Sequence, residues 1–258
     1  MKRKGLISMC FAAMVAIVAI VVSCQKESAP KEPTDIYEQI GKLHNEGLEF
    51  AFTYINAAQT KAGAKLTREQ ALVKGQESLD VFLAKHGITS VVTKSGIDEF
   101  KDYDGQGLNE KQKKYYDELI ETVLNPTLDY DNTQLAIDYI RNSIVRSLPS
   151  QDAEVLLYGI AVAKYSLEYW YKNTDKWTVA GAGLDAIAYS VTTKGQNPEG
   201  DDGLDWKEVA KGDVAGAVGG ALVGAAGGGV GAGPGALAGG LGGSIVSGIG
   251  ELWDWIFN

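Results

Sequence analysis

Few side chains in this 258-residue sequence could act on a substrate or hold a metal. It has two isolated histidines, His44 and His86, and two cysteines, Cys10 and Cys24. It contains no Gly-x-Ser-x-Gly nucleophile turn, no phosphate-binding Gly-x-x-x-x-Gly-Lys-Ser/Thr loop and no His-Glu-x-x-His pair. We therefore expect a non-enzymatic protein that needs neither a metal nor another cofactor.

One acidic stretch is similar to the start of a calcium-binding loop. Asp102 and Asp104 stand where the first two ligands of an EF-hand loop would stand, and Gly107 occupies its turn position. The twelfth position, which must be acidic, is Lys113. The sequence therefore predicts a polar turn before a helix at this place, and no calcium site.

The N-terminus has the pattern of an export signal. Three basic residues at positions 2–4 precede an uncharged run over 5–23, and Cys24 follows Ser23 directly. This pattern resembles the lipobox of bacterial lipoproteins. The resemblance implies cleavage of a signal peptide at 1–23, acylation of Cys24 with fatty acids such as palmitate, and a polar tether at 24–33. The alternative is an N-terminal membrane anchor, for which the apolar run is long enough.

The residues after Cys24 suggest where the protein is sent. The stretch Cys-Gln-Lys-Glu at 24–27 looks like the export signal of Bacteroidota-type lipoproteins. The resemblance implies a cell-envelope protein that is lipid-anchored in the outer membrane, with surface exposure as a further expectation. A net charge of −9 argues against nucleic acid as a partner, because nucleic-acid binding needs a clustered basic surface.

Residues 34–195 are predicted to form an all-α helical bundle domain. Apolar residues recur at helical spacing, and two capping boxes mark helix starts at Thr67 and Asn109. Gly87 is expected to end the helix that starts after Thr67. The expected helices begin near Thr34 and cover 67–85, 109–124, 135–148, 150–171 and 179–191. An aromatic-rich segment at 165–177 is expected to pack in the core, with a recognition surface as the alternative.

The C-terminal part carries an excess of glycine. Seventeen of the 32 glycines fall between positions 212 and 250, and no charged residue occurs over 214–250. A linker is predicted at 196–204, followed by a Gly/Ala-rich helical hairpin with an aromatic tail at 205–258. Its helices are expected at about 206–228 and 235–250, with their glycine faces opposed. The glycines recur with a period of four, at Gly212, Gly216, Gly220, Gly224 and Gly228, then at Gly231, Gly235, Gly239 and Gly243.

Helix formation in this segment needs compensation. Each interior glycine costs about 1 kcal/mol relative to alanine, so a dozen cost on the order of 12 kcal/mol. Close backbone packing or a lipid environment could offset that cost. The second arm, at 235–250, would be only about 24 Å long, which is short for a bilayer. Trp253 and Trp255 are of the type that favours a membrane interface.

The glycine segment resembles the glycine zippers of class II bacteriocins and of Gram-negative envelope proteins. The resemblance implies a hairpin that associates with membrane, self-assembles, or does both, as a bacteriocin-like or toxin-like element or a structural one. Unlike bacteriocin precursors, this chain places the segment behind a helical domain. The alternatives are a hairpin packed on its own domain and a flexible tail. A partner-binding envelope module with a structural docking hairpin is the alternative function.

Overall fold

The computed structural model describes residues 33–88, 102–182, 205–226 and 231–257. These residues contain seven helices and no strand, which confirms the predicted all-α fold. The hint of a strand after Ile88 lies outside the described residues. The helices are α2 (Pro33–Ala62), α3 (Arg68–Lys85), α5 (Glu110–Leu124), α6 (Tyr130–Ser147), α7 (Ser150–Ala182), α9 (Trp206–Ala226) and α10 (Ala232–Phe257).

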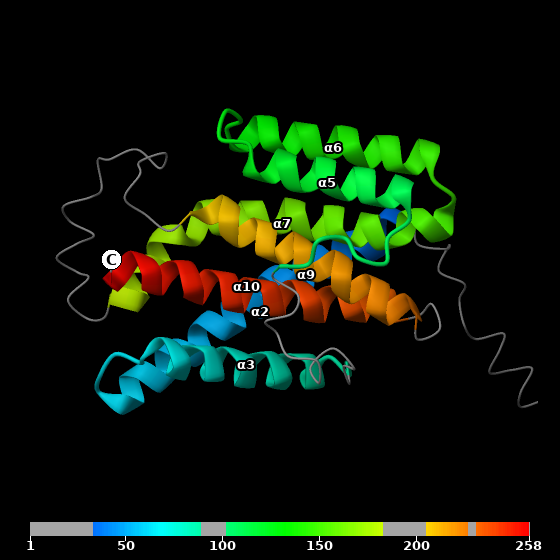
Figure 1. The fold of residues 1–258 in the computed structure, drawn as a ribbon. Coiled ribbons are helices and arrows are strands. Elements are labelled where there is room, and N and C mark those ends of the chain that lie inside the picture. Colours follow the sequence, from blue (N-terminus) through cyan, green and yellow to red (C-terminus); the bar gives the residue numbers. More distant parts are fainter. Residues whose placement is uncertain (1–32, 89–101, 183–204, 227–230, 258) are drawn as a thin grey trace, which may run out of the picture. The chain divides into compact units, whose positions relative to one another are not determined.

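Residues Tyr37–Asn258 form one compact unit. In it α9 and α10 lie side by side as an antiparallel pair, here named the glycine hairpin (Figure 1). Helices α5 and α7 contact it on one side and α3 on the other, while residues of α2 reach both of its helices. We call α2, α3, α5 and α7 the sheath. Helix α6 packs on α5 and α7 (Figure 1).

The predicted helix starts are formed by reciprocal capping. The Thr67 hydroxyl accepts from the Gln70 amide at 3.2 Å, and Gln70 Oε1 accepts from the Thr67 amide at 2.9 Å. Asn109 and Gln112 repeat the arrangement at the start of α5. Gly87, with φ of +71°, ends α3 as expected, and the Ile88 amide donates to the Leu83 carbonyl.

Two helices are longer than the sequence predicts. The sequence predicts a break between 171 and 179, but α7 continues through it, and Asn173 and Thr174 donate side-chain hydrogen bonds to carbonyls one turn earlier. The next turn is then held by Trp177, which is buried. Helix α10 continues to Phe257 because Leu252 extends the buried spacing of Ile245 and Ile249.

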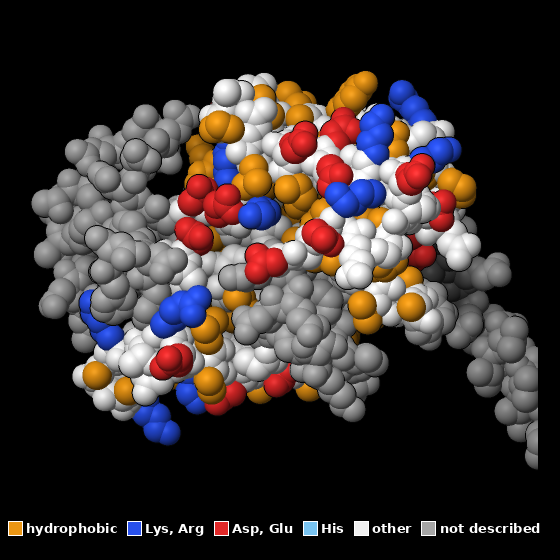
Figure 2. Space-filling view, viewed as in Figure 1, with side chains coloured by type: hydrophobic (Ala, Val, Ile, Leu, Met, Phe, Trp, Pro, Cys, Tyr) orange, Lys and Arg blue, Asp and Glu red, His pale blue; other side chains and the backbone are white. Residues whose placement is uncertain are grey.

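The core is continuous between the sheath and the glycine hairpin. Tyr169, Trp170 and Trp177 of the aromatic segment are buried in it, so this part of the segment serves packing. The surface over α5 and α6 mixes acidic, basic and apolar side chains, with no continuous basic patch on the face in view (Figure 2). The hairpin helices therefore belong to the same compact unit as the helices before them, while the predicted linker at 196–204 lies outside the described residues.

Candidate functional site: a glycine hairpin and a buried polar cluster

The two arms of the hairpin meet through their glycines in a constant register. The opposed pairs are Gly212–Gly243, Gly216–Gly239, Gly220–Gly235 and Gly224–Gly231. A Cβ atom on a member of the three inner pairs would collide with the carbonyl group of its opposite glycine. The interface is therefore backbone against backbone, and the two period-four glycine series of the sequence face each other within one chain. Gly228 lies outside the described residues.

The outer faces of the hairpin are apolar and sit in gaps left by glycines of the sheath. Val218 of α9 lies against Gly159 of α7, where a Cβ would be 3.8 Å from the Val218 Cβ. Ile245 of α10 lies against Gly75 of α3 in the same way, with a Cβ–Cβ distance of 3.7 Å. Leu241 fills the space beside Gly47 of α2. Three sheath helices thus each offer a glycine gap to one hairpin side chain.

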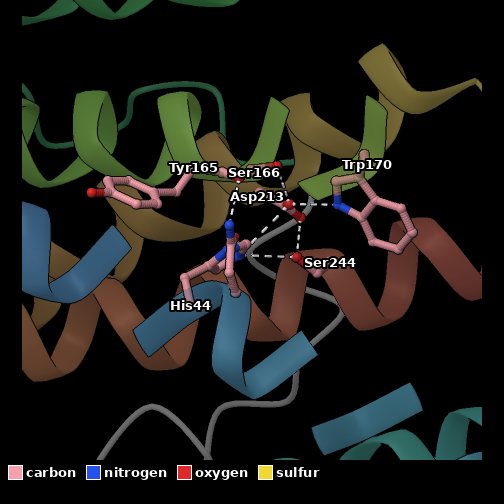
Figure 3. Close-up of polar contacts among 7 residues, drawn as sticks. His44, Tyr165, Ser166, Trp170, Asp213 and Ser244 are labelled. Atoms are coloured by element: carbon pink, nitrogen blue, oxygen red, sulfur yellow. Dashed lines mark hydrogen bonds and ion pairs between the residues drawn. The ribbon is translucent and has the colours of Figure 1, made fainter. Parts of the chain in front are cut away.

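A polar cluster of His44, Ser166, Trp170, Asp213 and Ser244 interrupts this apolar contact (Figure 3). Its centre is Asp213, which is fully buried. The Ser166 hydroxyl donates to Asp213 Oδ2 at 2.5 Å, and Trp170 Nε1–H donates to the same oxygen at 3.0 Å. The Ser244 hydroxyl donates to Oδ1. The carboxyl group therefore receives three hydrogen bonds, two from α7 and one from α10.

His44 of α2 completes the cluster. Its Nε2 lies 3.1 Å from Ser244 Oγ and 3.6 Å from Asp213 Oδ2. On the other side of the ring, Nδ1 lies 3.3 Å from Asn45 Oδ1. The Asn45 amide is itself oriented by donating to the Tyr165 carbonyl at 2.8 Å. The cluster thus joins α2, α7, α9 and α10 at one buried point.

Burial controls the protonation of the two ionisable members. It raises the pKa of the Asp213 carboxyl to about 7, although the three donated hydrogen bonds act in the opposite direction. It lowers the pKa of the His44 imidazole to about 4, against hydrogen bonds to Asn45 and to the Gly240 backbone. Treated as a pair, His44 and Asp213 hold one proton and no net charge between about pH 4 and about pH 7.

Serine, histidine and aspartate also form hydrolytic triads, but this geometry differs from one. In a triad the serine hydroxyl bonds to the histidine and the carboxylate orients the other ring nitrogen. Here Ser244 gives its hydrogen to Asp213, while Nδ1 of His44 faces Asn45. Both Ser244 and His44 are buried. The cluster suits the joining of helices better than catalysis.

Charge is distributed unevenly along the hairpin. Lys207, Glu208 and Lys211 lie in the first turns of α9, and the antiparallel register brings Glu251 of α10 to the same end. At this end a cleft of about 230 Å³ is lined by Glu208, Lys211 and Glu251, with Arg68 of α3. The other end, toward the turn between the helices, has no charged residue because 214–250 is charge-free.

Other predicted site residues fall partly outside the described structure. Cys24 lies outside it, and Trp253 and Trp255 lie in α10 with side chains that are not described. Among the described residues, no group of three His, Cys, Asp or Glu side chains could hold a metal ion. In the same part of the chain α9 alone is long and apolar enough to cross a membrane, a property it shares with core helices of soluble proteins.

Sequence reasoning missed the polar cluster. One signal was present, because Asp213 is an acid inside a helix that from that point on contains only glycine, alanine, valine and one leucine. His44 is isolated in the sequence, and nothing there joins it to a residue 169 positions away. Comparisons of the chain with protein-family models, curated proteins and solved structures found no match.

Proposed function

We propose that this chain is a non-enzymatic lipoprotein, anchored in the outer membrane through acylated Cys24, whose glycine hairpin enters a membrane when the sheath opens. One observation carries the proposal: the two hairpin helices turn their glycine faces toward each other and carry apolar side chains on their outer faces. Because the glycine faces already contact each other, we place the membrane contact on the outer faces, and we do not invoke self-assembly through glycine.

The composition of the outer faces suits lipid. The side chains that now contact the sheath include Val218, Leu241 and Ile245, all of which are buried. If the sheath moved away in water, these side chains would become exposed together, which is unfavourable. In lipid they would be solvated, while the glycine pairs would keep the close helix contact that small residues allow in membranes.

The dimensions and the charge distribution support turn-first insertion. At about 1.5 Å per residue, the 21 residues of α9 extend about 32 Å and the 26 residues of α10 about 39 Å. The full helices are longer than the second arm expected from the sequence, but their charge-free stretches, 214–226 and 232–250, extend only about 20 Å and about 28 Å, so the hairpin would enter the roughly 30 Å core without its charged end. The charged end would stay at the membrane surface, because the turn end carries no charge.

A covalent cross-link between sheath and hairpin tests the proposal. The Cβ separations at Gly159–Val218 and Gly75–Ile245 match those of disulfides, so cysteine pairs at these positions should close without backbone movement. The protein is the chain 24–258 with Cys24→Ser, carrying either Gly159→Cys with Val218→Cys or Gly75→Cys with Ile245→Cys. Each is added, at mildly acidic pH, to dye-filled vesicles of phosphatidylcholine and phosphatidylglycerol in equal amounts.

We expect the reduced proteins to release the dye and the oxidised proteins not to release it. The reduced form of each variant is its own control, and the single-cysteine variants show the effect of each substitution alone. Equal release before and after oxidation would show that the hairpin need not leave the sheath. No release by any form, with the protein remaining in solution, would remove the membrane function.

A partner-binding module is the second candidate function. It is favoured by the position of the hairpin in the core and by Leu135 and Tyr139, which are 67% and 71% exposed one turn apart on α6. A photo-crosslinking residue in place of Tyr139 should then capture one defined envelope protein in living cells. The same residue in place of exposed Val73, on α3, serves as the control. Capture from neither position, or from both alike, would argue against this function.

A further inference from the structure

Asp213 is unusual among the charged side chains of the described structure. It alone among the described Asp, Glu, Lys and Arg residues is fully buried. Burial of a carboxyl group is unfavourable, and apolar side chains of similar volume often stabilise such a position at least as well. An ionisable residue in an apolar helix is therefore expected to serve a purpose that depends on its charge.

The partners of Asp213 divide into two groups when the hairpin is considered as a moving part. Ser244 lies on α10 and would leave together with Asp213. Ser166, Trp170 and His44 lie on α7 and α2 and would stay behind. The contacts of Asp213 with Ser166, Trp170 and His44 are thus polar contacts between the hairpin and the sheath. At the glycine gaps, by contrast, the same interface is apolar.

Building on the membrane function proposed above, we propose that the polar cluster holds the hairpin in the sheath, and we call this cluster the latch. The hairpin is released when Asp213 leaves its partners on α2 and α7 as a neutral carboxylic acid. As a carboxylate it stays in place, because an ionised carboxylate accepts the three hydrogen bonds of the cluster and is strongly disfavoured in lipid. The neutral acid keeps its contact with Ser244 and can move with the hairpin.

The proton for this step has two sources. Below neutral pH the cluster already holds one proton. If that proton is on His44, it moves from Nε2 to Asp213 Oδ2, which lies 3.6 Å away, and leaves the imidazole neutral in the sheath. Above neutral pH the proton comes from water. Among the described residues that contact Asp213, His44 alone is titratable, since the partners from α7 and α10 are serine and tryptophan side chains.

The step requires one proton, so dye release should follow the titration of one group. Because the pKa of Asp213 lies at about 7, the rate of dye release should change little between pH 5 and pH 7 for the parent chain, which is residues 24–258 with Cys24→Ser. Above pH 7 it should fall about tenfold for each pH unit, as the fraction of neutral acid falls. At pH 9 the rate should then be about 100-fold below its value at pH 5, where the acid is almost fully neutral.

The experiment measures release rates between pH 5 and pH 9 for the chain 24–258 with Cys24→Ser and for three variants of it. Asp213→Asn should release dye at one rate between pH 7 and pH 9, about 100-fold above the parent at pH 9. Ser166→Ala should release faster at every pH but keep the slope of the parent, because it loosens the latch without removing the carboxyl group. Ile137→Ala, a buried α6 change away from the hairpin, controls for general destabilisation and should also keep the slope.

The outcomes separate this proposal from the function on which it builds. If Asp213→Asn keeps the pH slope of the parent, the latch is wrong while the membrane function stands. If the parent and Asp213→Asn both release no dye at any pH, the membrane function itself fails. Should the asparagine variant not fold, Asp213→Ser provides the same neutral test with a smaller side chain, and a pH slope in that variant would likewise overturn the latch.

Discussion

Gly216 and Gly239 face each other across the hairpin with no space for a side chain on either one. A Cβ on Gly216 would lie 2.7 Å from the carbonyl carbon of Gly239, and a Cβ on Gly239 would lie 2.9 Å from that of Gly216. The obstacle is backbone in both directions, so no side-chain rotation can relieve it. These glycines are required for the distance between the helices, and their conformational freedom is secondary.

Replacing either member of this pair should therefore destabilise the fold. Gly216→Ala gains about 1 kcal/mol of helix propensity, but forces the two helices apart. Overpacking of this kind costs about 1–3 kcal/mol, and the rigid backbone opposite places this site at the upper end. We expect a net loss of about 1–2 kcal/mol in the free energy of unfolding, measured by urea denaturation with circular dichroism.

A matched control lies on α10, the other helix of the hairpin. A Cβ on Gly250 would have an ordinary 3.5 Å contact with the Arg68 guanidinium as its nearest neighbour. Gly250→Ala should therefore stabilise the protein by up to about 1 kcal/mol through helix propensity. Equal effects of the alanine substitutions at 216 and 250 would contradict the backbone contact.

The hydroxyl of Ser166 should contribute more to stability than a buried serine that bonds within its own helix. Ser166 donates to the buried carboxyl of Asp213, and hydrogen bonds to charged groups contribute about 1.5–3 kcal/mol. Ser78 is also buried but donates to the Gly75 carbonyl three residues earlier. At pH 8 we expect Ser166→Ala to lower the free energy of unfolding by about 2 kcal/mol and Ser78→Ala by about 1 kcal/mol. The reverse order would contradict an ionised Asp213 at that pH.

Removing His44 should reveal the titration of Asp213. The carboxyl pKa is about 7 in the fold and 3.8 in the unfolded chain, so the folded state binds the proton more tightly. The contribution of this proton to the free energy of unfolding is fully present below pH 3.8 and is lost as the pH rises through 7. His44→Gln should therefore lose stability between pH 4 and pH 7, by a few kcal/mol, in thermal unfolding followed across that range. A flat profile would show that Asp213 is not desolvated.

Removing Asp213 should give the opposite slope. His44 has a pKa of about 4 in the fold and 6.5 in the unfolded chain, so its stability is present above pH 6.5 and lost as the pH falls through 4. Asp213→Asn should thus become less stable on acidification. The parent should change little between pH 4 and pH 6.5, because folded and unfolded pairs both hold one proton there. Parallel slopes in the two variants would contradict this assignment.

Lipid attachment is predicted at one position. Cys24→Ser should abolish incorporation of labelled palmitate in a bacterial host and release the protein from the membrane fraction. Cys10→Ser, inside the predicted signal peptide, is the control and should leave both properties unchanged. Labelling that persists without Cys24 would reject the lipoprotein interpretation.

Local signals allowed much of the fold to be predicted. The capping boxes at Thr67 and Asn109 and the terminal glycine at 87 act within a few residues, so the sequence contains them completely. The period-four glycines likewise predicted two opposed faces. The continuation of α7 was missed because Asn173 and Thr174 resemble a linker by type, whereas their side chains bond back into the helix.

The polar cluster could not be predicted in the same way. Its members come from four helices, and the contact between His44 and Asp213 exists only because α2, α7 and the hairpin pack in one particular arrangement. That arrangement is set by contacts such as Leu241 beside Gly47, which join residues far apart in the chain. Composition and periodicity carry no information about such pairs.

A repeat of four residues allows the two hairpin helices to pair in more than one register, and the polar cluster distinguishes between these registers. If α10 slid along α9 by one turn, Gly216 would meet Gly235 instead of Gly239, and the glycine surfaces would fit almost as well as before. The glycine contacts alone therefore leave several alignments nearly equivalent. The hydrogen bond from Ser244 to Asp213 exists in only one of them. The buried acid in an otherwise uniform interface thus fixes the register of the two helices, because only one of the nearly equivalent alignments keeps its hydrogen bond.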